Sequence, residues 1–185
     1  MRTFIAIDLD EALKKSLAAL VDELKPMAGN VRWVGLSGMH LTLKFLGEIP
    51  EEEVAGISSV LEDIAGRHRP FPLLFKGTGA FPPGKRQPRV LWVGAAPVSA
   101  LTSLQGDIEK EMERQGYERE RRPFRPHLTL GRVKYPAPFD SLINSLKQHE
   151  ERIFGEMNVR SFIFFRSILS PSGAQYSALK EFRLR

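Results

Sequence analysis

Hydrophobic residues recur along this chain at two spacings, one typical of helices and the other of strands. Apolar residues three or four positions apart predict four amphipathic helices, whose buried faces would be Leu13, Leu17, Leu20, Val21 and Leu24; Val54, Ile57, Leu61 and Ile64; Leu101, Leu104, Ile108 and Met112; and Phe139, Leu142, Ile143 and Leu146. Alternating or β-branched segments predict strands at residues 2–9, 31–34, 39–46, 71–76, 90–93, 127–133, 154–169 and 175–184. Residues 77–89 are rich in turn-forming residues and predict a loop that is too long for a tight hairpin.

The order of these elements indicates the fold class. Helices and strands alternate, with paired strands in both halves of the chain, but without the strict β-α-β rhythm of a parallel doubly wound sheet. We therefore expect an α+β fold with largely antiparallel sheets. The two halves share a similar order of helix, strands, helix and strands, and neither a low-complexity segment nor a linker separates them. A single domain over residues 1–185, made of two similar lobes that each have helices and a largely antiparallel sheet, fits this order.

The composition excludes several classes of protein. A chain of 185 residues can bury close to ~70% of its unfolded surface, so its stability needs neither a disulfide nor a structural metal. The absence of cysteine excludes disulfides, cysteine-ligated zinc, iron–sulfur clusters and a cysteine nucleophile. No apolar run approaches the ~18 residues of a membrane-spanning helix, and Asp8 and Asp10 interrupt any secretory core near the N-terminus. By elimination we expect a cytoplasmic protein with no membrane association.

Positive charge is concentrated in two segments. The chain has 27 Lys and Arg against 22 Asp and Glu, a net charge of +5 that by itself identifies no partner. Between Arg114 and Lys134, however, there are seven cationic side chains and only two acidic ones, Glu118 and Glu120. The loop at 77–89 adds a smaller cluster of Lys85, Arg86 and Arg89. Such clusters suit a phosphate-bearing partner, although charge alone equally allows a merely solvated surface.

The tetrapeptide His-Leu-Thr-Leu occurs twice, at residues 40–43 and 127–130, and uses two of the four histidines. Coincidence is a poor explanation, because chance would produce such a pair in roughly one chain in a thousand of this composition. Both copies lie in predicted strands, where residues i and i+2 point to the same face. The histidine and threonine of each copy therefore project together while the leucines face the core. A lone copy would be an ordinary core strand, whereas two copies from similar halves can face each other across a cleft.

Two histidines in one site can form an acid–base pair. With an unperturbed pKa of ~6.5, one imidazole can be neutral and accept a proton while the other is charged and donates one. On this hypothesis His40 and His127 are the catalytic pair. The hydroxyl groups of Thr42 and Thr129, together with a nearby arginine, can hold an anion between them.

Two cationic residues close to the repeats are candidates for phosphate binding. Arg132 would point away from His127 in an ideal strand, but a bend at Gly131 would bring it back to the same face. Lys44 lies four residues after His40 and in a regular strand shares its face. An exposed lysine at a strand edge is an equally good interpretation of Lys44.

A metal site is the competing explanation for paired histidines, and the sequence does not favour it. Neither tetrapeptide contains a carboxylate, no His-x-His or His-Glu-x-x-His spacing occurs, and cysteine is absent. The other two histidines, His68 and His149, follow predicted helices and are expected to be solvated. The sequence also contains neither a glycine-rich phosphate loop nor a Gly-x-Ser-x-Gly motif. We therefore expect no metal and no cofactor.

Several segments of the chain, including both repeats, are similar to the 2H phosphoesterases and within them to the RNA 2′,3′-cyclic phosphodiesterases first described as 2′-5′ RNA ligases. These segments extend over nearly the whole chain and are RTFIAIDL at 2–9, MHLTLKFLGEIP at 39–50, RVLWVG at 89–94, RPFRPHLTLGRV at 122–133 and FRSILSPSGAQYSALKEFRL at 165–184. The resemblance implies a bilobal α+β fold in which each lobe contributes one His-x-Thr motif to a central cleft. It also implies that His40 is the proton donor and His127 the proton acceptor, with Thr42, Thr129 and Arg132 binding the phosphate.

The same resemblance implies a reaction and a partner. Members of this family open a 2′,3′-cyclic phosphate at an RNA end to leave a 2′-phosphate without a metal, and some join or cleave 2′-5′ linkages in tRNA halves without ATP. We therefore expect a monomer that acts on RNA with 2′,3′-cyclic phosphate ends, including tRNA fragments. Phe81 and Tyr135 are candidates for stacking on the terminal base. Two alternatives stay open, an ATP-independent 2′-5′ RNA ligase acting on tRNA halves and a non-catalytic RNA-end binding protein.

Overall fold

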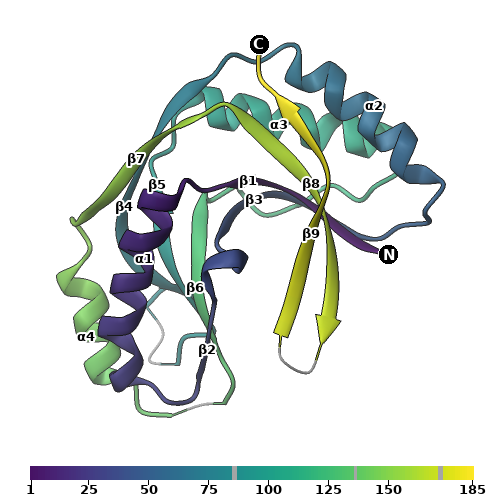
Figure 1. Ribbon diagram of the computed structural model, residues 1–185. Helices are drawn as coiled ribbons and strands as arrows, with labels where there is room; N and C mark the ends of the chain where they lie inside the picture. The colour runs from purple at the N-terminus through teal and green to yellow at the C-terminus, as the bar shows by residue number, and fades with distance from the viewer. Residues whose placement is uncertain (85–86, 136, 171–172) are drawn as a thin grey trace.

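The computed structural model describes residues 1–84, 87–135, 137–170 and 173–185, over which the chain forms four α-helices and nine β-strands (Figure 1). This confirms the predicted α+β class. The helices are α1 (Glu11–Leu24), α2 (Glu53–Ala65), α3 (Ser99–Arg114) and α4 (Asp140–Gln148). The strands are β1 (Arg2–Asp8), β2 (Val31–Trp33), β3 (His40–Glu48), β4 (Phe71–Phe81), β5 (Val90–Ala95), β6 (His127–Val133), β7 (Ile153–Val159), β8 (Ser161–Ser170) and β9 (Gly173–Arg183).

Helix α1 shows how local chemistry sets the element boundaries. The carboxylate of Asp10 accepts a hydrogen bond from the backbone N–H of Leu13 at 2.8 Å, and so satisfies one of the free donors of the first turn. At the other end the chain passes into a short 3₁₀ turn that contains Pro26, which has no N–H to continue the α-helix. The predicted apolar stripe is buried, namely Leu13, Leu17, Leu20, Val21 and Leu24.

A single antiparallel sheet contains all nine strands. Its order is β7-β4-β5-β6-β3-β1-β8-β9, and β2 pairs separately with β6. All strand pairs among the described residues are antiparallel, as predicted. The expectation of one sheet for each half of the molecule is wrong, because β3 and β6 pair at Leu41 and Leu128 and join the two sets of strands.

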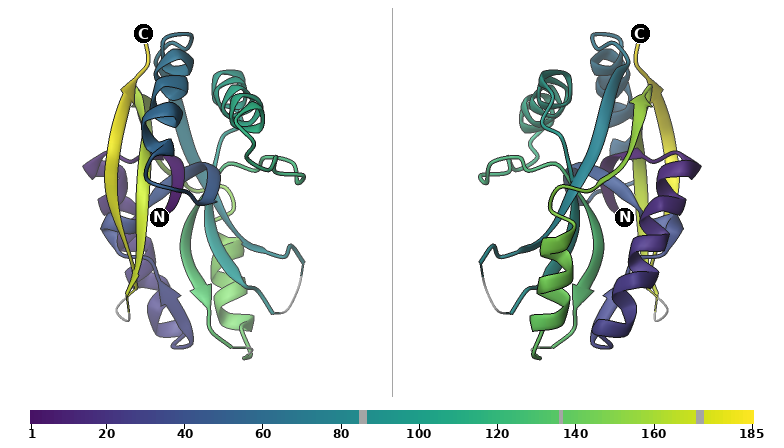
Figure 2. Two further views of the ribbon diagram at one scale, coloured as in Figure 1. Left: turned by 90° about the vertical axis from the view of Figure 1, so that its right-hand side faces the viewer. Right: turned by 90° about the vertical axis from the view of Figure 1, so that its left-hand side faces the viewer.

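The sheet has the same arrangement on both sides of this central β3–β6 pair. From the centre outward the strands are β6, β5, β4 and β7 on one side and β3, β1, β8 and β9 on the other. Helices α1 and α4 contact the first set, and α2 and α3 contact the second. Figure 2 shows the two pairs of helices at opposite ends of the molecule. The two histidine motifs thus lie on the two innermost strands.

Two strand boundaries differ from the sequence prediction. Strand β4 continues through Gly77 and Gly79 to Phe81, where a loop was expected. The missing side chain of Gly79 is what permits this, since a Cβ there would collide with the indole ring of Trp92 on the neighbouring strand. The continuous strand expected over 154–169 is divided into β7 and β8, because the two parts pair with different strands, β4 and β1.

Buried apolar residues from both halves form one continuous cluster. It includes the leucines of both repeats, Leu41, Leu43, Leu128 and Leu130, all at most 3% exposed. As predicted, the leucines of each repeat face the core while the histidine and threonine do not. No helix within the described part of the chain is both long enough and apolar enough to cross a membrane.

Candidate active site

The two His-Leu-Thr-Leu repeats lie beside each other in the sheet. Strand β3 begins at His40 and β6 at His127, and the antiparallel pairing of Leu41 with Leu128 aligns the two copies at their second residue. Extending this register by one residue in each direction places His40 opposite Thr129, and Thr42 opposite His127. Directly opposed residues share a face of an antiparallel sheet. The four polar side chains of the repeats therefore gather on one face, related by an approximate two-fold axis.

A β-bulge lies at the same place in each repeat. In the β1–β3 pair, Ile5 pairs with Lys44 and Ala6 with Thr42, which leaves Leu43 as the extra residue. In the β5–β6 pair, Leu91 pairs with Gly131 and Trp92 with Thr129, which leaves Leu130 extra. An extra residue shifts the alternation of the strand by one. The residue directly after each bulge, Lys44 or Gly131, accordingly turns to the buried side, and the next one, Phe45 or Arg132, turns to the open side.

The bulge in β6 brings Arg132 to the face of His127. Arg132 is exposed, and its charge contributes to a lowered pKa of His127, so the guanidinium and the imidazole lie within electrostatic range. Gly131 accommodates the turn of the strand because a Cβ there would lie 2.6 Å from Cγ1 of Val31. The irregularity that was predicted at Gly131 lies one residue earlier in the chain, at Leu130, which the register of β5 and β6 leaves unpaired.

The bulge in β3 has the opposite effect on Lys44. Instead of sharing the face of His40, this side chain is buried and its ammonium donates to Oε2 of Glu109 at 2.7 Å and to the carbonyl oxygen of Glu118 at 2.9 Å. The prediction that Lys44 faces the site is wrong, because the argument assumed a regular strand. With its charge neutralised inside the core, Lys44 cannot serve as a phosphate ligand.

A backbone hydrogen bond orients His127. Its Nδ1 lies 2.7 Å from the carbonyl oxygen of Arg125, and a carbonyl can only accept, so Nδ1 carries the proton and Nε2 is left with its lone pair. Burial lowers the pKa of His127, the hydrogen bond to Arg125 opposes this, and the charge of Arg132 lowers it further. The neutral ring is thus the stable form at neutral pH, and its Nε2 can accept a proton.

His40 lies among aromatic rings. It stacks on Phe4, with ring centroids 4.7 Å apart, meets Tyr176 edge-on at 5.1 Å and lies 6.0 Å from Phe165. Burial lowers the pKa of His40 to about 4, and the carboxylate of Asp8, which pairs with His40 across β1 and β3, partly opposes that effect. His40 is therefore uncharged in the free protein at neutral pH, and an anion bound beside it would raise its pKa.

The aromatic neighbours of His40 were not identified from the sequence. Phe165 and Tyr176 come from β8 and β9, more than a hundred residues along the chain, so no spacing relative to His40 marks them. Both residues lie in the segment 165–184, which resembles the 2H phosphoesterases. That resemblance is the one signal in the sequence that could have suggested them. Phe4 comes from β1, is 2% exposed, and packs its ring against the imidazole of His40.

The structure separates the two candidates for base stacking. Phe81 meets His127 edge-on, with ring centroids 5.1 Å apart, and lies beside Trp92, so the structure places it next to one of the two repeated histidines. Tyr135 lies beyond the opposite end of β6, where its backbone carbonyl accepts a hydrogen bond from the Asn30 side chain at 2.6 Å. The structure therefore does not bring Tyr135 to the histidines, because an extended strand carries it away from them.

The remaining histidines and the basic segments lie outside this group. His68 and His149 were expected to be solvated, but each pairs with a carboxylate. His68 lies 2.9 Å from Asp107 and His149 lies 2.8 Å from Glu23. Four arginines of the 114–134 segment pair with glutamates, namely Arg114, Arg119, Arg121 and Arg122. Lys85 and Arg86 of the second cluster lie outside the described residues. Among the residues that are described, no three His, Asp or Glu side chains are grouped so as to hold a metal ion.

Comparison with known proteins gives consistent similarities over the whole chain. Residues 11–167 match the 2′-5′ RNA ligase superfamily. A protein of Archaeoglobus fulgidus named RNA 2′,3′-cyclic phosphodiesterase is 37% identical over 183 residues, which cover 98% of this chain and 99% of that protein. A protein of the same name from Methanothermobacter thermautotrophicus is 34% identical and covers 100% of this chain and 99% of its own length.

Solved structures are similar over the same extent. TT0787 of Thermus thermophilus is 32% identical with a TM-score of 0.86, covering 100% of this chain and 98% of that one. The E. coli LigT structure in complex with 3′-AMP is 28% identical with a TM-score of 0.77, covering 99% and 97% of the two chains. The nine-stranded antiparallel α+β fold is therefore one that solved proteins share.

Proposed function

The chain belongs to the 2′-5′ RNA ligase superfamily, and on this premise we propose that it hydrolyses RNA 2′,3′-cyclic phosphate ends to 2′-phosphomonoesters by acid–base catalysis between two histidines, without a metal ion. The observation that carries the proposal is the pairing of Leu41 with Leu128, which aligns both His-x-Thr motifs on one face of the sheet. The names of the full-length relatives support the choice of substrate.

The proposed reaction needs one proton removed and one delivered on opposite sides of phosphorus. A water molecule would attack phosphorus from the side of His127, whose Nε2 lone pair accepts its proton. The P–O3′ bond would break on the other side, and His40 would protonate the departing O3′. The phosphate stays on O2′, so the product is a 2′-phosphomonoester with a free 3′-hydroxyl. Because the reactive phosphate is anionic, its binding would also raise the pKa of His40 and so charge the donor.

The threonines and Arg132 would stabilise the charge that develops on the non-bridging oxygens. Thr42 and Thr129 lie on the shared face between the histidines, and each hydroxyl can donate one hydrogen bond. Arg132 is exposed on the same face and supplies a full positive charge with several donors. Such preformed donors usually contribute most to this kind of catalysis.

We further propose that residues 1–185 form one bilobal unit. The two four-strand halves of the sheet, each with its own pair of helices, would be the lobes, and the cleft would lie over β3 and β6. The terminal base would lie against an aromatic side chain of the site, for which Phe81 stays a prediction.

A 2′-5′ ligase activity is the second candidate, and the description of the superfamily favours considering it. Ligation would use the same site, because the 5′-hydroxyl of a second RNA, such as the other half of a cleaved tRNA, would take the place of water. The two reactions therefore differ in the nucleophile and not in the residues that handle the protons.

One assay tests the proposed hydrolysis directly. We expect the protein to convert a 2′,3′-cyclic nucleotide into the 2′-phosphate alone in the presence of EDTA, because two imidazoles and no metal ion move the protons. Chromatography against 2′- and 3′-phosphate standards measures both the rate and the oxygen that leaves. Activity that EDTA abolishes and zinc restores contradicts the mechanism, and an unchanged nucleotide that still binds identifies a non-catalytic RNA-end binder.

The dependence of kcat/KM on pH should be bell-shaped with a maximum below pH 6.5. The free enzyme needs His40 protonated, with a pKa of about 4, and His127 neutral, with a pKa below its ordinary value of 6.5. The neutral fraction of His127 falls at pH values below its pKa, and the protonated fraction of His40 falls at pH values above its own pKa. The product of the two fractions therefore has a maximum midway between the two pKa values and falls on both sides of it. Rates measured from pH 3 to 10 test this, and His127→Ala should lose the rising limb. A rate that still increases at pH 10 excludes the histidine pair.

A further inference from the structure

We propose that Lys44, Glu109 and Gln105 form a buried polar network that positions the loop leading into His127, an inference that rests on the proposed function. The network lies on the face of the sheet opposite the histidines, and the mechanism above does not use it. Its members come from β3 and α3, and it contacts the segment between α3 and β6. It therefore connects the strand of one motif with the approach to the other.

The centre of the network is an ion pair shielded from water. The ammonium of Lys44 lies 2.7 Å from Glu109, and their side chains are 2% and 7% exposed. Gln105 donates from Nε2 to the other carboxylate oxygen at 3.3 Å and also to the carbonyl oxygen of Leu43 at 3.4 Å. Burying a charged pair gains little over apolar residues of the same shape, because both ions lose their hydration. The contribution of this network thus lies in the geometry that it imposes.

That geometry concerns both histidine motifs. Leu43 is the extra residue of the β3 bulge, and the contact from Gln105 satisfies a carbonyl next to the point where the alternation of the strand shifts. On the other side, Lys44 donates to the carbonyl oxygen of Glu118 at 2.9 Å, and Glu109 accepts from the backbone N–H of Glu120 at 3.3 Å. Two backbone groups of the loop are thus tied to β3 and α3.

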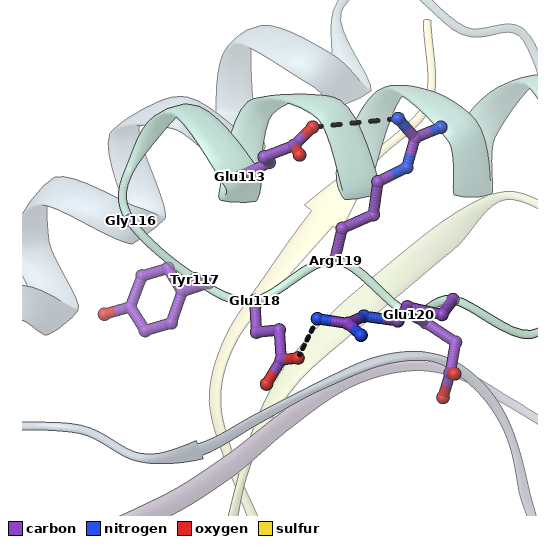
Figure 3. Close-up of a pocket in the computed structure, with 7 residues that line it drawn as sticks. Glu113, Gly116, Tyr117, Glu118, Arg119 and Glu120 are labelled. Carbon is purple, nitrogen blue, oxygen red and sulfur yellow. Dashed lines mark ion pairs between the residues drawn. The ribbon is translucent and has the colours of Figure 1, made fainter.

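The exposed ion pair on the same loop adds little to hold it. Figure 3 shows the chain running from Gly116 past Tyr117 to Glu120, with Arg119 paired to Glu113. The nitrogen and oxygen of this pair lie 3.7 Å apart and its two side chains are 65% and 51% exposed, so solvent screens the attraction and the pair contributes little to stability. The backbone contacts to the ion pair, in contrast, are partly buried and involve Lys44 and Glu109, whose side chains are only 2% and 7% exposed.

The end of the loop contacts His127 directly. The loop ends at Arg125, whose carbonyl oxygen accepts the Nδ1–H of His127 at 2.7 Å. Pro123 and Pro126 flank this residue and limit the backbone freedom of the segment. A loop released at Glu118 and Glu120 would move the Arg125 carbonyl, and the histidine would lose both its orientation and the hydrogen bond that opposes the lowering of its pKa. Lys44 is in this sense a positioning residue.

The test replaces the ion pair with apolar residues, in the double variant Lys44→Met with Glu109→Leu. This variant leaves no buried charge unpaired, so it should keep the fold, as thermal unfolding and circular dichroism would show. Its kcat on a 2′,3′-cyclic mononucleotide should fall by about 10- to 100-fold, since small misplacements of a catalytic group have effects of this size. The maximum of the kcat/KM profile should also move to lower pH, because the pKa of His127 falls with the loss of the Arg125 contact.

Glu113→Gln is the matched control, because it breaks a surface ion pair on the same loop and should leave kcat and the pH profile unchanged. A folded double variant with the wild-type kcat and pH profile would overturn the proposal, and so would a loss of kcat with an unmoved maximum of the pH profile. An NMR titration of the His127 ring adds a readout that does not depend on catalysis. A lower His127 pKa in the double variant supports the positioning network even if the wild-type protein hydrolyses no cyclic phosphate, so the two proposals can fail separately.

Discussion

Replacing either His40 or His127 by alanine is expected to lower the rate of cyclic phosphate hydrolysis by about 10²- to 10⁴-fold, the range for the loss of one acid–base group. His127→Ala removes the Nε2 acceptor that the Arg125 carbonyl orients. His40→Ala removes the donor for O3′. The rate of conversion of a 2′,3′-cyclic nucleotide, measured in EDTA with product separation, checks both variants.

His149→Ala is the control for these two variants. His149 pairs with Glu23 on the surface and should keep the wild-type rate. His40 packs against Phe4 and Tyr176, so circular dichroism must show that its alanine variant remains folded. A folded His40→Ala or His127→Ala protein with more than about a tenth of the wild-type rate would exclude that residue from proton transfer, since a general acid or base contributes at least ~10²-fold.

Replacing Arg132 by glutamine should lower kcat/KM by about 10²- to 10³-fold, as does the removal of a single charge-stabilising donor in other enzymes. The β6 bulge directs this guanidinium to the face of His127, where it would neutralise charge on the phosphate oxygens. Glutamine keeps a hydrogen-bond donor but not the charge, so the difference reports the electrostatic contribution. A fall in kcat with little change in KM would place the interaction in the transition state.

Arg121→Gln provides the comparison for Arg132. The side chain of Arg121 is 90% exposed and pairs loosely with Glu118, so its loss should change the rate on a mononucleotide less than about twofold. An equal fall in kcat/KM in the two variants would mean that the reaction depends on the net positive charge of the protein and not on the position of Arg132. A wild-type rate for Arg132→Gln would remove it from the site.

The repeated tetrapeptide made the core of the site predictable. Strand periodicity placed each histidine with its threonine, and the repetition indicated that the two copies belong together. The structure brings them onto neighbouring strands of one sheet. The predicted orientation of each repeat is confirmed, with its leucines in the core and its histidine and threonine outside it. It could be predicted because a period of two is a local property of extended backbone, which requires no knowledge of the rest of the chain.

Lys44 and Arg132 show where that local argument ends. In a regular strand Lys44 would have faced the site and Arg132 would not, and the structure has the reverse. The reason in both cases is an extra residue that its partner strand leaves unpaired, after Thr42 on β3 and after Thr129 on β6. A bulge depends on how two strands pair, so one strand's pattern of residues does not reveal it, although Gly131 gave a hint for the second.

The sequence by itself determined the α+β class, the buried faces of the helices and the polar residues of the two repeats, because each of these follows from periodicity within a single segment. Only the tertiary structure decided that one sheet joins both halves, that Phe165 and Tyr176 surround His40, and that the buried pair of Lys44 and Glu109 lies behind the site. These features depend on contacts between segments far apart in the chain. Such contacts are selected by packing and by the pairing of polar groups in the whole fold, which no local pattern records.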